Sequence, residues 1–320
     1  MQKTAIITGI TGQDGSYLAQ LLLNHNYKVV GLTRSYSNIN PNPFRYLNID
    51  GKVTIEECDL LDFSSIIKIL MKYKPDEFYN LAAQSSVAVS FKEPIGTISF
   101  NTQSLINILE SIRILKLDTR VYQASSSEMF GKVVNLPVDE QTLLHPLSPY
   151  AISKATAYWI GVNYRESYDV YCTNGILFNH ESYLRSPNFF VKKVVQTSVD
   201  IKNNRKSELL VGHIDIKRDF GYAPDYVRAM WLSLQQPKSG DYLICSGTSI
   251  YLRDLIFYVF DYLNISKDKL VVDLSMFRPT DIEDIFGNNS KAKTLLKWEY
   301  DKTFYNVLDI LIEEEIKNFK

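Results

Sequence analysis

The feature that most constrains the fold is an alternation of short apolar runs with helical stretches, which begins at the start of the chain. TAIITGI (4–10) has the composition of a buried strand, SYLAQLLLNH (16–25) fits a helix, and YKVVGLT (27–33) fits a second strand. Strands that alternate with helices predict a parallel sheet covered by helices on both faces. The alternation continues, with strands expected at 53–58, 76–82 and 119–125 and helices expected at 63–73 and 95–116.

The pattern becomes looser beyond about residue 175, where we expect shorter elements. We therefore predict an α/β protein with a Rossmann-type doubly wound parallel sheet and a smaller α/β substrate-binding lobe. Residues 1–177 are assigned to the nucleotide-binding domain, to which segments near 210–245 return, and residues 178–320 mainly to the interleaved lobe. Segment 34–52, rich in Asn, Pro and Ser, is predicted to be a loop. Helices of the second half are expected near 188–203, 224–236, 251–264 and 302–318.

Size, charge and cysteine content narrow the class of protein further. The chain has 320 residues, 45% of them hydrophobic, which is enough for a large core. A net charge of −1 without a long basic run gives no reason to expect a nucleic-acid partner. No apolar run approaches the roughly 20 residues that span a bilayer, and the N-terminus lacks a signal-peptide pattern, so neither membrane insertion nor secretion is expected.

The cysteines suggest a reducing compartment. Cys58, Cys172 and Cys245 lie far apart in apolar segments and form no CxxC pair. This pattern favours buried free thiols over a metal site or a disulfide framework, and it fits a cytoplasmic protein.

A glycine-rich loop directly follows the first expected strand. In GITGQDG, Gly9, Gly12 and Gly15 are spaced three apart, and a helix begins at once after them. Glycines at this spacing allow a tight turn and let backbone N–H groups approach a pyrophosphate at the helix N-terminus. We therefore predict a dinucleotide site that includes the intervening residues Thr11, Gln13 and Asp14; the alternative is a plain glycine turn.

The end of the second strand bears on the choice of cofactor. An acidic residue there would bind a free ribose 2′-hydroxyl, but this sequence has Arg34, and a cation suits a 2′-phosphate. We expect NADP rather than NAD, the alternative being a solvated surface arginine. Asp59, after the third strand, is placed to meet the adenine edge, with Leu60 beside it. An N-cap role for Asp59 or Asp62 is the competing interpretation.

The motif SPYAISK places Tyr150 and Lys154 four residues apart on a predicted helix, and therefore on one face. A tyrosine pKa of about 10 must fall by about three units, at a cost of about 4 kcal/mol, for the phenol to act as a base at neutral pH. The Lys154 ammonium and a cationic nicotinamide would both favour the phenolate. With 21 tyrosines in the chain the spacing alone could be accidental. Combined with the glycine loop and the hydroxyl-rich stretch QASSSEMFG, it indicates hydride transfer at a secondary alcohol.

Several blocks of the sequence resemble one family. The chain is similar to the extended short-chain dehydrogenase/reductases and, more narrowly, to the GDP-mannose 4,6-dehydratases, from the first strand to about residue 295. NGILFNHES is the most specific of these blocks. The others are GITGQDGSYL, NLAAQSSVAVSF, QASSSEMFG, SPYAISKATAYW, NYRESY, KRDFGYAPDYVRAMW and RPTDIED.

The resemblance implies that Ser126, Glu128, Tyr150 and Lys154 are the catalytic residues. It implies NADP-dependent conversion of GDP-mannose to GDP-4-keto-6-deoxymannose, in which C4 is oxidised, water is eliminated across C5 and C6, and hydride returns to C6. Glu128 would take the C5 proton as general base. An epimerase or a 4-reductase needs no base at C5, so Glu128 favours a dehydratase over them. The alternative is that Glu128 is a surface residue that begins a turn and has no catalytic role.

The resemblance also assigns cofactor and substrate residues. Ser85 would reach the sugar, Asn179 and His180 would lie at the sugar and nicotinamide, and Asp281 could accept hydrogen bonds from a ribose. The basic residues would bind the diphosphate, although each could also be a solvated ion pair. The remaining cofactor residues are Leu81, Ala82, Ala83, Gln84 and Arg185, and the remaining substrate residues are Ser86, Lys193, Arg218 and Arg278. No metal ligand is predicted.

The sequence departs from the family pattern near the sugar. Ser126 replaces the usual Thr and keeps the hydroxyl, Ser86 replaces a common His, and ESYLRSPNFF (181–190) differs from Glu-Ser-Pro-Arg-Arg-Gly. A GDP-heptose of manno configuration, such as GDP-D-glycero-D-manno-heptose, is therefore an alternative substrate for the same chemistry. Beside dehydration of GDP-mannose and dehydration of a GDP-heptose, a third interpretation is a catalytically silent NADP-binding or scaffold protein. The loop from Arg34 and the segment containing Arg185 lie where tetrameric members of the family contact a neighbour's cofactor, so the resemblance implies a homotetramer, with a homodimer as the alternative.

Overall fold

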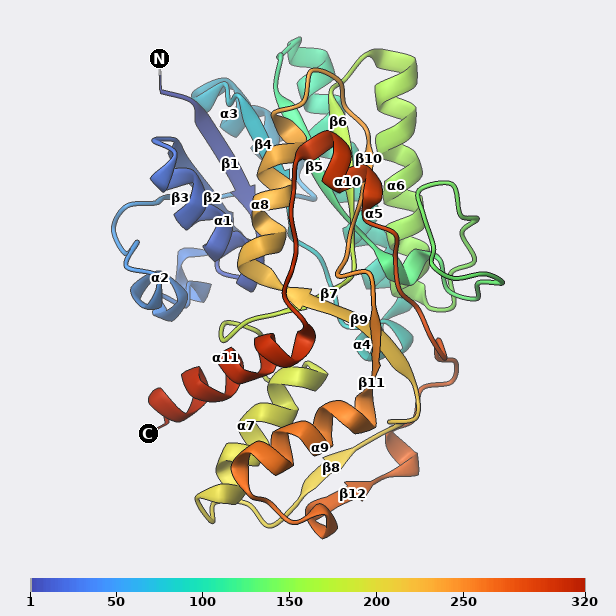
Figure 1. The fold of residues 1–320 in the computed structure, drawn as a ribbon. Coiled ribbons are helices and arrows are strands. Elements are labelled where there is room, and N and C mark those ends of the chain that lie inside the picture. The colour runs from blue at the N-terminus through green and yellow to red at the C-terminus, as the bar shows by residue number, and fades with distance from the viewer. Residues whose placement is uncertain (1, 320) are drawn as a thin grey trace.

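The computed structural model describes residues 2–319 and contains a seven-stranded parallel sheet (Figure 1). The strand order is β10-β6-β5-β4-β1-β2-β3, so the direction of winding reverses between β1 and β4. This doubly wound arrangement confirms the predicted fold class, and it places ligands at the carboxyl ends of the strands near the reversal. The strands are β1 (Thr4–Thr8), β2 (Lys28–Thr33), β3 (Thr54–Glu57), β4 (Glu77–Asn80), β5 (Arg120–Ser126), β6 (Cys172–Leu177) and β10 (Asp241–Ile244).

Helices cover both faces of this sheet because side chains that alternate along each strand are apolar on both sides. In β1, Ala5 and Ile7 belong to the core beneath α1 and α8, whereas Ile6 belongs to the core on the opposite face. One face carries α1 (Gln13–Asn24), α8 (Ala223–Leu234) and α10 (Ser290–Leu296). The other carries α3 (Phe63–Tyr73), α5 (Pro94–Leu115) and α6 (Pro149–Tyr168).

A second lobe lies at the carboxyl end of the sheet, in the lower half of Figure 1. Its apolar core includes Val191, Leu255, Phe260 and Leu308, which are almost completely buried. A three-stranded sheet, β11-β9-β7, lies between this core and the large sheet. The lobe is built from α7 (Phe190–Lys202), α9 (Leu252–Leu263), α11 (Phe304–Lys317), β7 (Asn179–Glu181), β8 (Leu209–Val211), β9 (Lys217–Tyr222), β11 (Ser249–Tyr251) and β12 (Leu270–Val272).

The segment predicted to be a loop, 34–52, contains a short helix, α2 (Asn42–Tyr46). Pro43 lies at its first turn, where a missing N–H costs no hydrogen bond. Phe44 and Leu47 are buried in the core that contains Tyr17 of α1. The prediction of a structureless loop was therefore wrong, because two apolar side chains among the Asn and Pro residues supply a tertiary contact. A second short helix, α4 (Val87–Lys92), was also not predicted.

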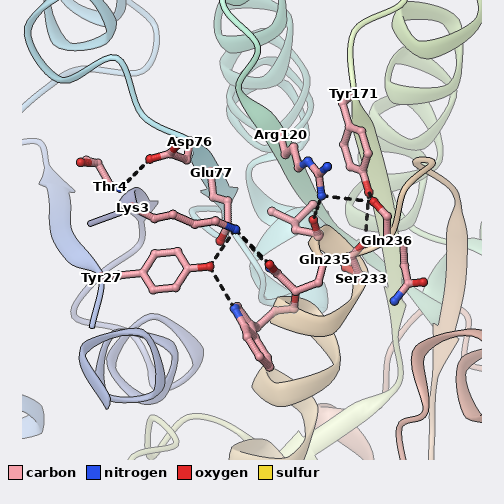
Figure 2. Close-up of polar contacts among 12 residues, drawn as sticks. Lys3, Thr4, Tyr27, Asp76, Glu77, Arg120, Tyr171, Ser233, Gln235 and Gln236 are labelled. Atoms are coloured by element: carbon pink, nitrogen blue, oxygen red, sulfur yellow. Dashed lines mark hydrogen bonds and ion pairs between the residues drawn. The ribbon is translucent and has the colours of Figure 1, made fainter. Parts of the chain in front are cut away.

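A buried polar network lies at the amino ends of the strands, away from the glycine loop (Figure 2). Glu77 of β4 is fully buried and accepts hydrogen bonds from Lys3, Tyr27 and Gln235 at 2.9–3.1 Å. Tyr79 donates to its second oxygen at 2.8 Å. Lys3, Tyr27 and Gln235 lie directly before β1, directly before β2 and directly after α8, so Glu77 joins these three parts of the fold to β4.

The three cysteines are buried and free, as predicted. Between residues 2 and 319, none of the helices combines the length and the apolarity that a membrane span needs.

Candidate active site

The glycine loop connects β1 to α1 at the point where the winding of the sheet reverses. Gly9 has φ +67°, a conformation that favours glycine, and a Cβ on Gly15 would come within 2.3 Å of the Gly9 carbonyl oxygen. Gly12 is the N-cap of α1 and provides no side chain to satisfy the first N–H groups of the helix. The loop therefore leaves both space and backbone donors for an anionic group.

The side chains between these glycines are directed to β7. Gln13 donates to the His180 carbonyl at 3.1 Å and accepts from the Ser182 hydroxyl at 2.8 Å. Both Asp14 oxygens lie within 3.0 Å of Nε2 of His180. Gln13 and Asp14 thus line the predicted cofactor site, yet their side chains are occupied by contacts with the second lobe.

The Asp14–His180 contact is an ion pair. His180 has Nδ1 2.7 Å from the Phe178 carbonyl oxygen and Nε2 2.8 Å from Asp14. Burial acts to lower the pKa of His180, but the Asp14 carboxylate outweighs it and the pKa is raised. Burial likewise acts to raise the pKa of Asp14, which His180 and Arg185 hold below its usual value. Each shift in pKa favours the charged form of its own group.

The predicted catalytic residues come together from β5 and α6. Ser126 is the last residue of β5, and its hydroxyl accepts from the Glu128 N–H at 3.3 Å, which starts a single 3₁₀ turn. Ser148 caps α6 by accepting from the Ala151 N–H at 3.1 Å. Tyr150 and Lys154 follow one turn apart on α6, and both are buried. Glu128 is half-buried at the same cavity.

The pKa of Tyr150 differs from the expectation that Lys154 lowers it. Burial raises the pKa of Tyr150 to about 12, while hydrogen bonding to the Ser126 hydroxyl acts to lower it. Lys154 donates to the Ala124 carbonyl at 2.8 Å, and burial lowers its own pKa to about 8. Desolvation is the largest cause of both shifts, and the protein alone keeps Tyr150 as a neutral phenol.

The segment after β4 forms the wall opposite the glycine loop. Thr8 accepts hydrogen bonds from the N–H groups of Leu81 and Ala82, both at 3.0 Å. Gln84 lines the cavity, but its side-chain amide is bound to Thr97 and to the backbone of Ser86. Its predicted cofactor contact is therefore limited to atoms outside that amide.

Asn101 of α5 is a site residue that the sequence did not reveal. Its side chain bonds to the backbone of Gln84 at 2.9 and 3.1 Å and to the Ser153 hydroxyl at 2.9 Å. It thus joins the wall after β4 to the helix that carries Tyr150 and Lys154. Asn101 shares its buried helix face with Thr97 and Ser104, so the helical pattern does not single it out.

The loop, the strand ends and the second lobe enclose one cavity of about 1120 Å³. All predicted site residues line it except Asp59. Asp59 instead accepts from the Leu61 N–H at 3.0 Å. The N-cap of α3 is Asp62, so an N-cap role is confirmed for Asp62 and not for Asp59. Arg34 lines the cavity with an exposed side chain.

The basic residues of the second lobe differ in availability. Arg218 is buried and donates to the Ile282 carbonyl and to Asp281, both at 2.5 Å. Arg278 is more exposed and lies 3.6 Å from the same Asp281 oxygen. Asp281 therefore orients two arginines, a contact that competes with its predicted hydrogen bond to a ribose. Lys193 also lines the cavity, and burial lowers its pKa.

Asp219 is a second residue that the sequence analysis missed. It is fully buried beside Arg218 and accepts from the N–H groups of Ser246, Gly247 and Gly287 at 2.9–3.4 Å. Burial raises its pKa to about 6. These contacts fix β9, and with it Arg218, to the loop that follows β10.

The doubly wound sheet, the glycine loop and the Tyr-x-x-x-Lys helix facing one cavity define the class, which is the extended short-chain dehydrogenase/reductases. Solved structures share this fold at low sequence identity. RMD from Pseudomonas aeruginosa complexed with NADPH has a TM-score of 0.83 and 22% identity, with 99% of both chains covered. DesIV, a dTDP-glucose 4,6-dehydratase from Streptomyces venezuelae with NAD and TYD bound, has a TM-score of 0.88 and 20% identity, with 98% of this chain and 97% of that chain covered.

Sequence comparison narrows the class to one family. The model of the GDP-mannose 4,6 dehydratase family matches residues 6–311. GDP-mannose 4,6 dehydratase 1 of Arabidopsis thaliana is 41% identical over 99% of this chain and 90% of its own length. GDP-mannose 4,6-dehydratase of Vibrio cholerae is 38% identical over 99% and 95%. The chain belongs to the GDP-mannose 4,6-dehydratase family.

Proposed function

We propose that the protein catalyses the NADP-dependent 4,6-dehydration of GDP-mannose to GDP-4-keto-6-deoxymannose. The family membership and the names of its relatives support the reaction. The observation that carries it is the carboxylate of Glu128, which faces the same cavity as Tyr150. That phenol serves oxidation of a carbinol, and a carboxylate beside it serves removal of the neighbouring carbon-bound proton.

The residues at the glycine loop fit NADP. The Cβ that Gly15 lacks would fill the space beside the Gly9 carbonyl, and the free N–H groups at the start of α1 suit a diphosphate. Arg34 supplies a cation where a 2′-phosphate would lie. Bound NADP would provide the hydride acceptor for C4 and the hydride donor for C6.

In this mechanism the protein side chains move the protons. Tyr150 takes the proton of the 4-hydroxyl, and Ser126 stabilises the phenolate through its hydroxyl. The ketone at C4 acidifies C5, so Glu128 can remove the C5 proton and pass it to the departing C6 hydroxyl as water. C5 then takes up one proton, which balances the proton that Tyr150 removed from the 4-hydroxyl. The sugar thus loses one water without net oxidation.

The first prediction concerns Glu128. Glu128→Gln should abolish loss of water from GDP-mannose, measured by mass spectrometry, and should leave NADPH binding intact, because the amide cannot take the C5 proton. Glu166→Gln, on the exposed side of α6, is the matched control and should retain activity. Retained turnover in Glu128→Gln would mean that another base acts at C5. A wild-type protein that changed the sugar only when NADPH was consumed would be a reductase.

A GDP-heptose is the second candidate substrate. Ser86 lines the cavity, as do Arg185, Asn188, Phe189 and Phe190 of segment 181–190, and both stretches depart from the family pattern. A sugar with one more carbon beyond C6 would use the same catalytic residues. Comparing kcat/KM for GDP-mannose and GDP-manno-heptose decides which of the two is the substrate.

We further propose that the chain forms a homodimer or homotetramer in the cytoplasm. Support comes from α5 and α6, which expose Ile95 (81%) and Trp159 (59%). Such side chains favour burial against a second copy. Light scattering during gel filtration should give two or four times the chain mass, and Trp159→Glu should lower it. A monomeric wild-type protein would contradict the proposal.

A further inference from the structure

The glycine loop contains a carboxylate where an anion is expected to bind. Asp14 lies in the first turn of α1, two residues after the Gly12 N-cap. A negative side chain there interacts favourably with the helix dipole, but it would repel a diphosphate held by the same helix end. A loop of this composition therefore needs a counter-charge if it is to bind a dinucleotide well.

His180 supplies that counter-charge from the other side of the cavity. Its two ring nitrogens face two acceptors, the Phe178 carbonyl at 2.7 Å and the Asp14 carboxylate at 2.8 Å. The lowered pKa of Asp14 favours its carboxylate form, and a carboxylate and a carbonyl only accept, so the geometry calls for a hydrogen on both nitrogens, which is the imidazolium form. The ring is 6% exposed and stacks on Tyr226 of α8 with centroids 4.8 Å apart.

The charged groups around this pair alternate in sign. Glu181 follows His180 in β7 and lies 3.6 Å from Arg185, which belongs to the loop after β7. Arg185 acts on the pKa values of both Asp14 and His180. Asp14, His180, Glu181 and Arg185 thus form two opposite pairs, and the site carries no net charge from them. Gln13, bound to the same strand, adds no charge.

We propose that His180 is a positioning residue for the dinucleotide loop, which it holds against β7 while neutralising Asp14, so that the loop accepts a diphosphate. This role rests on the proposed function, because NADP is the cofactor named there. Both ring nitrogens of His180 face protein acceptors, so its side chain acts through Asp14. The glycine loop of the first domain and the first strand of the second lobe are thereby joined by a charge pair.

The proposal gives cofactor affinity a defined dependence on pH. The pKa of His180 is raised, so the imidazolium persists above the ordinary histidine range and is lost as pH rises through the raised value. The pKa of Asp14 is lowered, so its charge is lost only at acid pH. Between these limits the pair is intact. Above the upper limit an uncompensated carboxylate remains in the loop, and NADPH affinity falls.

A double-mutant cycle on the full-length protein tests the role. NADPH binding is titrated by fluorescence for wild type, Asp14→Asn, His180→Asn and the double variant. His180→Asn should weaken binding about tenfold, because it leaves Asp14 unpaired. The double variant should bind within about threefold of Asp14→Asn, because the repelling charge is gone. His25→Asn, at an exposed histidine, is the matched control and should bind as wild type does.

Losses that simply add in the double variant, or unchanged binding by His180→Asn, would overturn the proposal. A proton NMR titration of the ligand-free protein provides a second readout that survives poor folding of the His180 variant. The pKa of the His180 ring should lie above the ordinary histidine range and should fall in Asp14→Asn; an unchanged value would also overturn the proposal. If wild type bound no NADPH, the proposed cofactor would be wrong, while this titration would still decide the pairing.

Discussion

At the scale of the residue, the site depends on how Tyr150 is made a base. Burial raises its pKa to about 12, and the lysine one turn away is itself buried and has a pKa lowered to about 8. The Ser126 hydroxyl is the neighbour whose hydrogen bonding favours the phenolate. Ser126 therefore contributes to base strength as well as to substrate placement, and the change from Thr to Ser preserves that contribution.

Ser126→Ala should shift the pH dependence of turnover. Loss of the hydroxyl raises the pKa of Tyr150 further, so the rising limb of the kcat/KM profile should move to higher pH and activity at neutral pH should fall about tenfold or more. Steady-state kinetics across pH measure the shift. Ser127→Ala, at the adjacent position, should leave the limb in place. An unshifted rising limb in Ser126→Ala would show that the Ser126 hydroxyl does not help to make Tyr150 a base.

The sequence predicted which residues meet, but not what their side chains bind. Motif spacing was enough to bring Tyr150, Lys154 and Glu128 to one cavity, because strand ends and helix faces follow from the pattern. The partners of Asp14 and Asp281 are His180 and Arg218, which lie on distant segments of the chain. Such pairings depend on the packed lobe, and no local pattern predicts them.

At the scale of the element, the long helices and parallel strands follow closely from periodicity. The helix expected at 63–73 is Phe63–Tyr73, and the one expected at 95–116 is Pro94–Leu115. Asp62 accepts from the Ser64 N–H at 2.9 Å and so fixes the first of these boundaries. Pro94 in the first turn of α5 sets the second.

Short elements of the second lobe could not be predicted in the same way. β8 and β12 have three residues each and pair in parallel, although β9, α8, β10, β11 and α9 separate them in the chain. A three-residue strand contains too few positions to show a period of two. Tertiary packing decides whether such a segment is extended, as it decides that α2 is helical.

At the scale of the whole molecule, Glu77 connects segments at the amino ends of the strands, whereas residues at the carboxyl ends, such as Thr8 and Thr33, line the cavity. Its carboxylate accepts hydrogen bonds from Lys3 just before β1, Tyr27 just before β2 and Gln235 just after α8 (Figure 2). Nearby, Arg120 donates to the carbonyl of Leu234, the last residue of α8, and Tyr171 donates to the carbonyl of Gln236 just beyond it. The amino ends of the strands are thus held by hydrogen bonds, whereas the carboxyl ends face the cavity and can bind ligands.

Glu77→Gln should destabilise the fold without impairing the site. The amide accepts fewer hydrogen bonds and leaves buried donors unpaired, so the free energy of unfolding should fall by about 2–3 kcal/mol. Urea denaturation followed by circular dichroism measures it. Asp76 is an exposed neighbour, and the contact that Figure 2 draws for it is with the Thr4 N–H. Asp76→Asn should therefore lower the free energy of unfolding by less than Glu77→Gln does. An equal loss in both variants, or a loss of NADPH binding in Glu77→Gln, would contradict this assignment.

The place of β10 has a consequence for how the chain is made. Asp241–Ile244 pairs with β6, whereas residues 178–240 contribute β7, α7, β8 and β9 before that strand appears. During synthesis, β6 keeps an open edge, exposed to wrong partners, until residue 244 has left the ribosome. A messenger truncated before that codon would yield a nascent chain whose sheet lacks β10 and leaves β6 unpaired on that side.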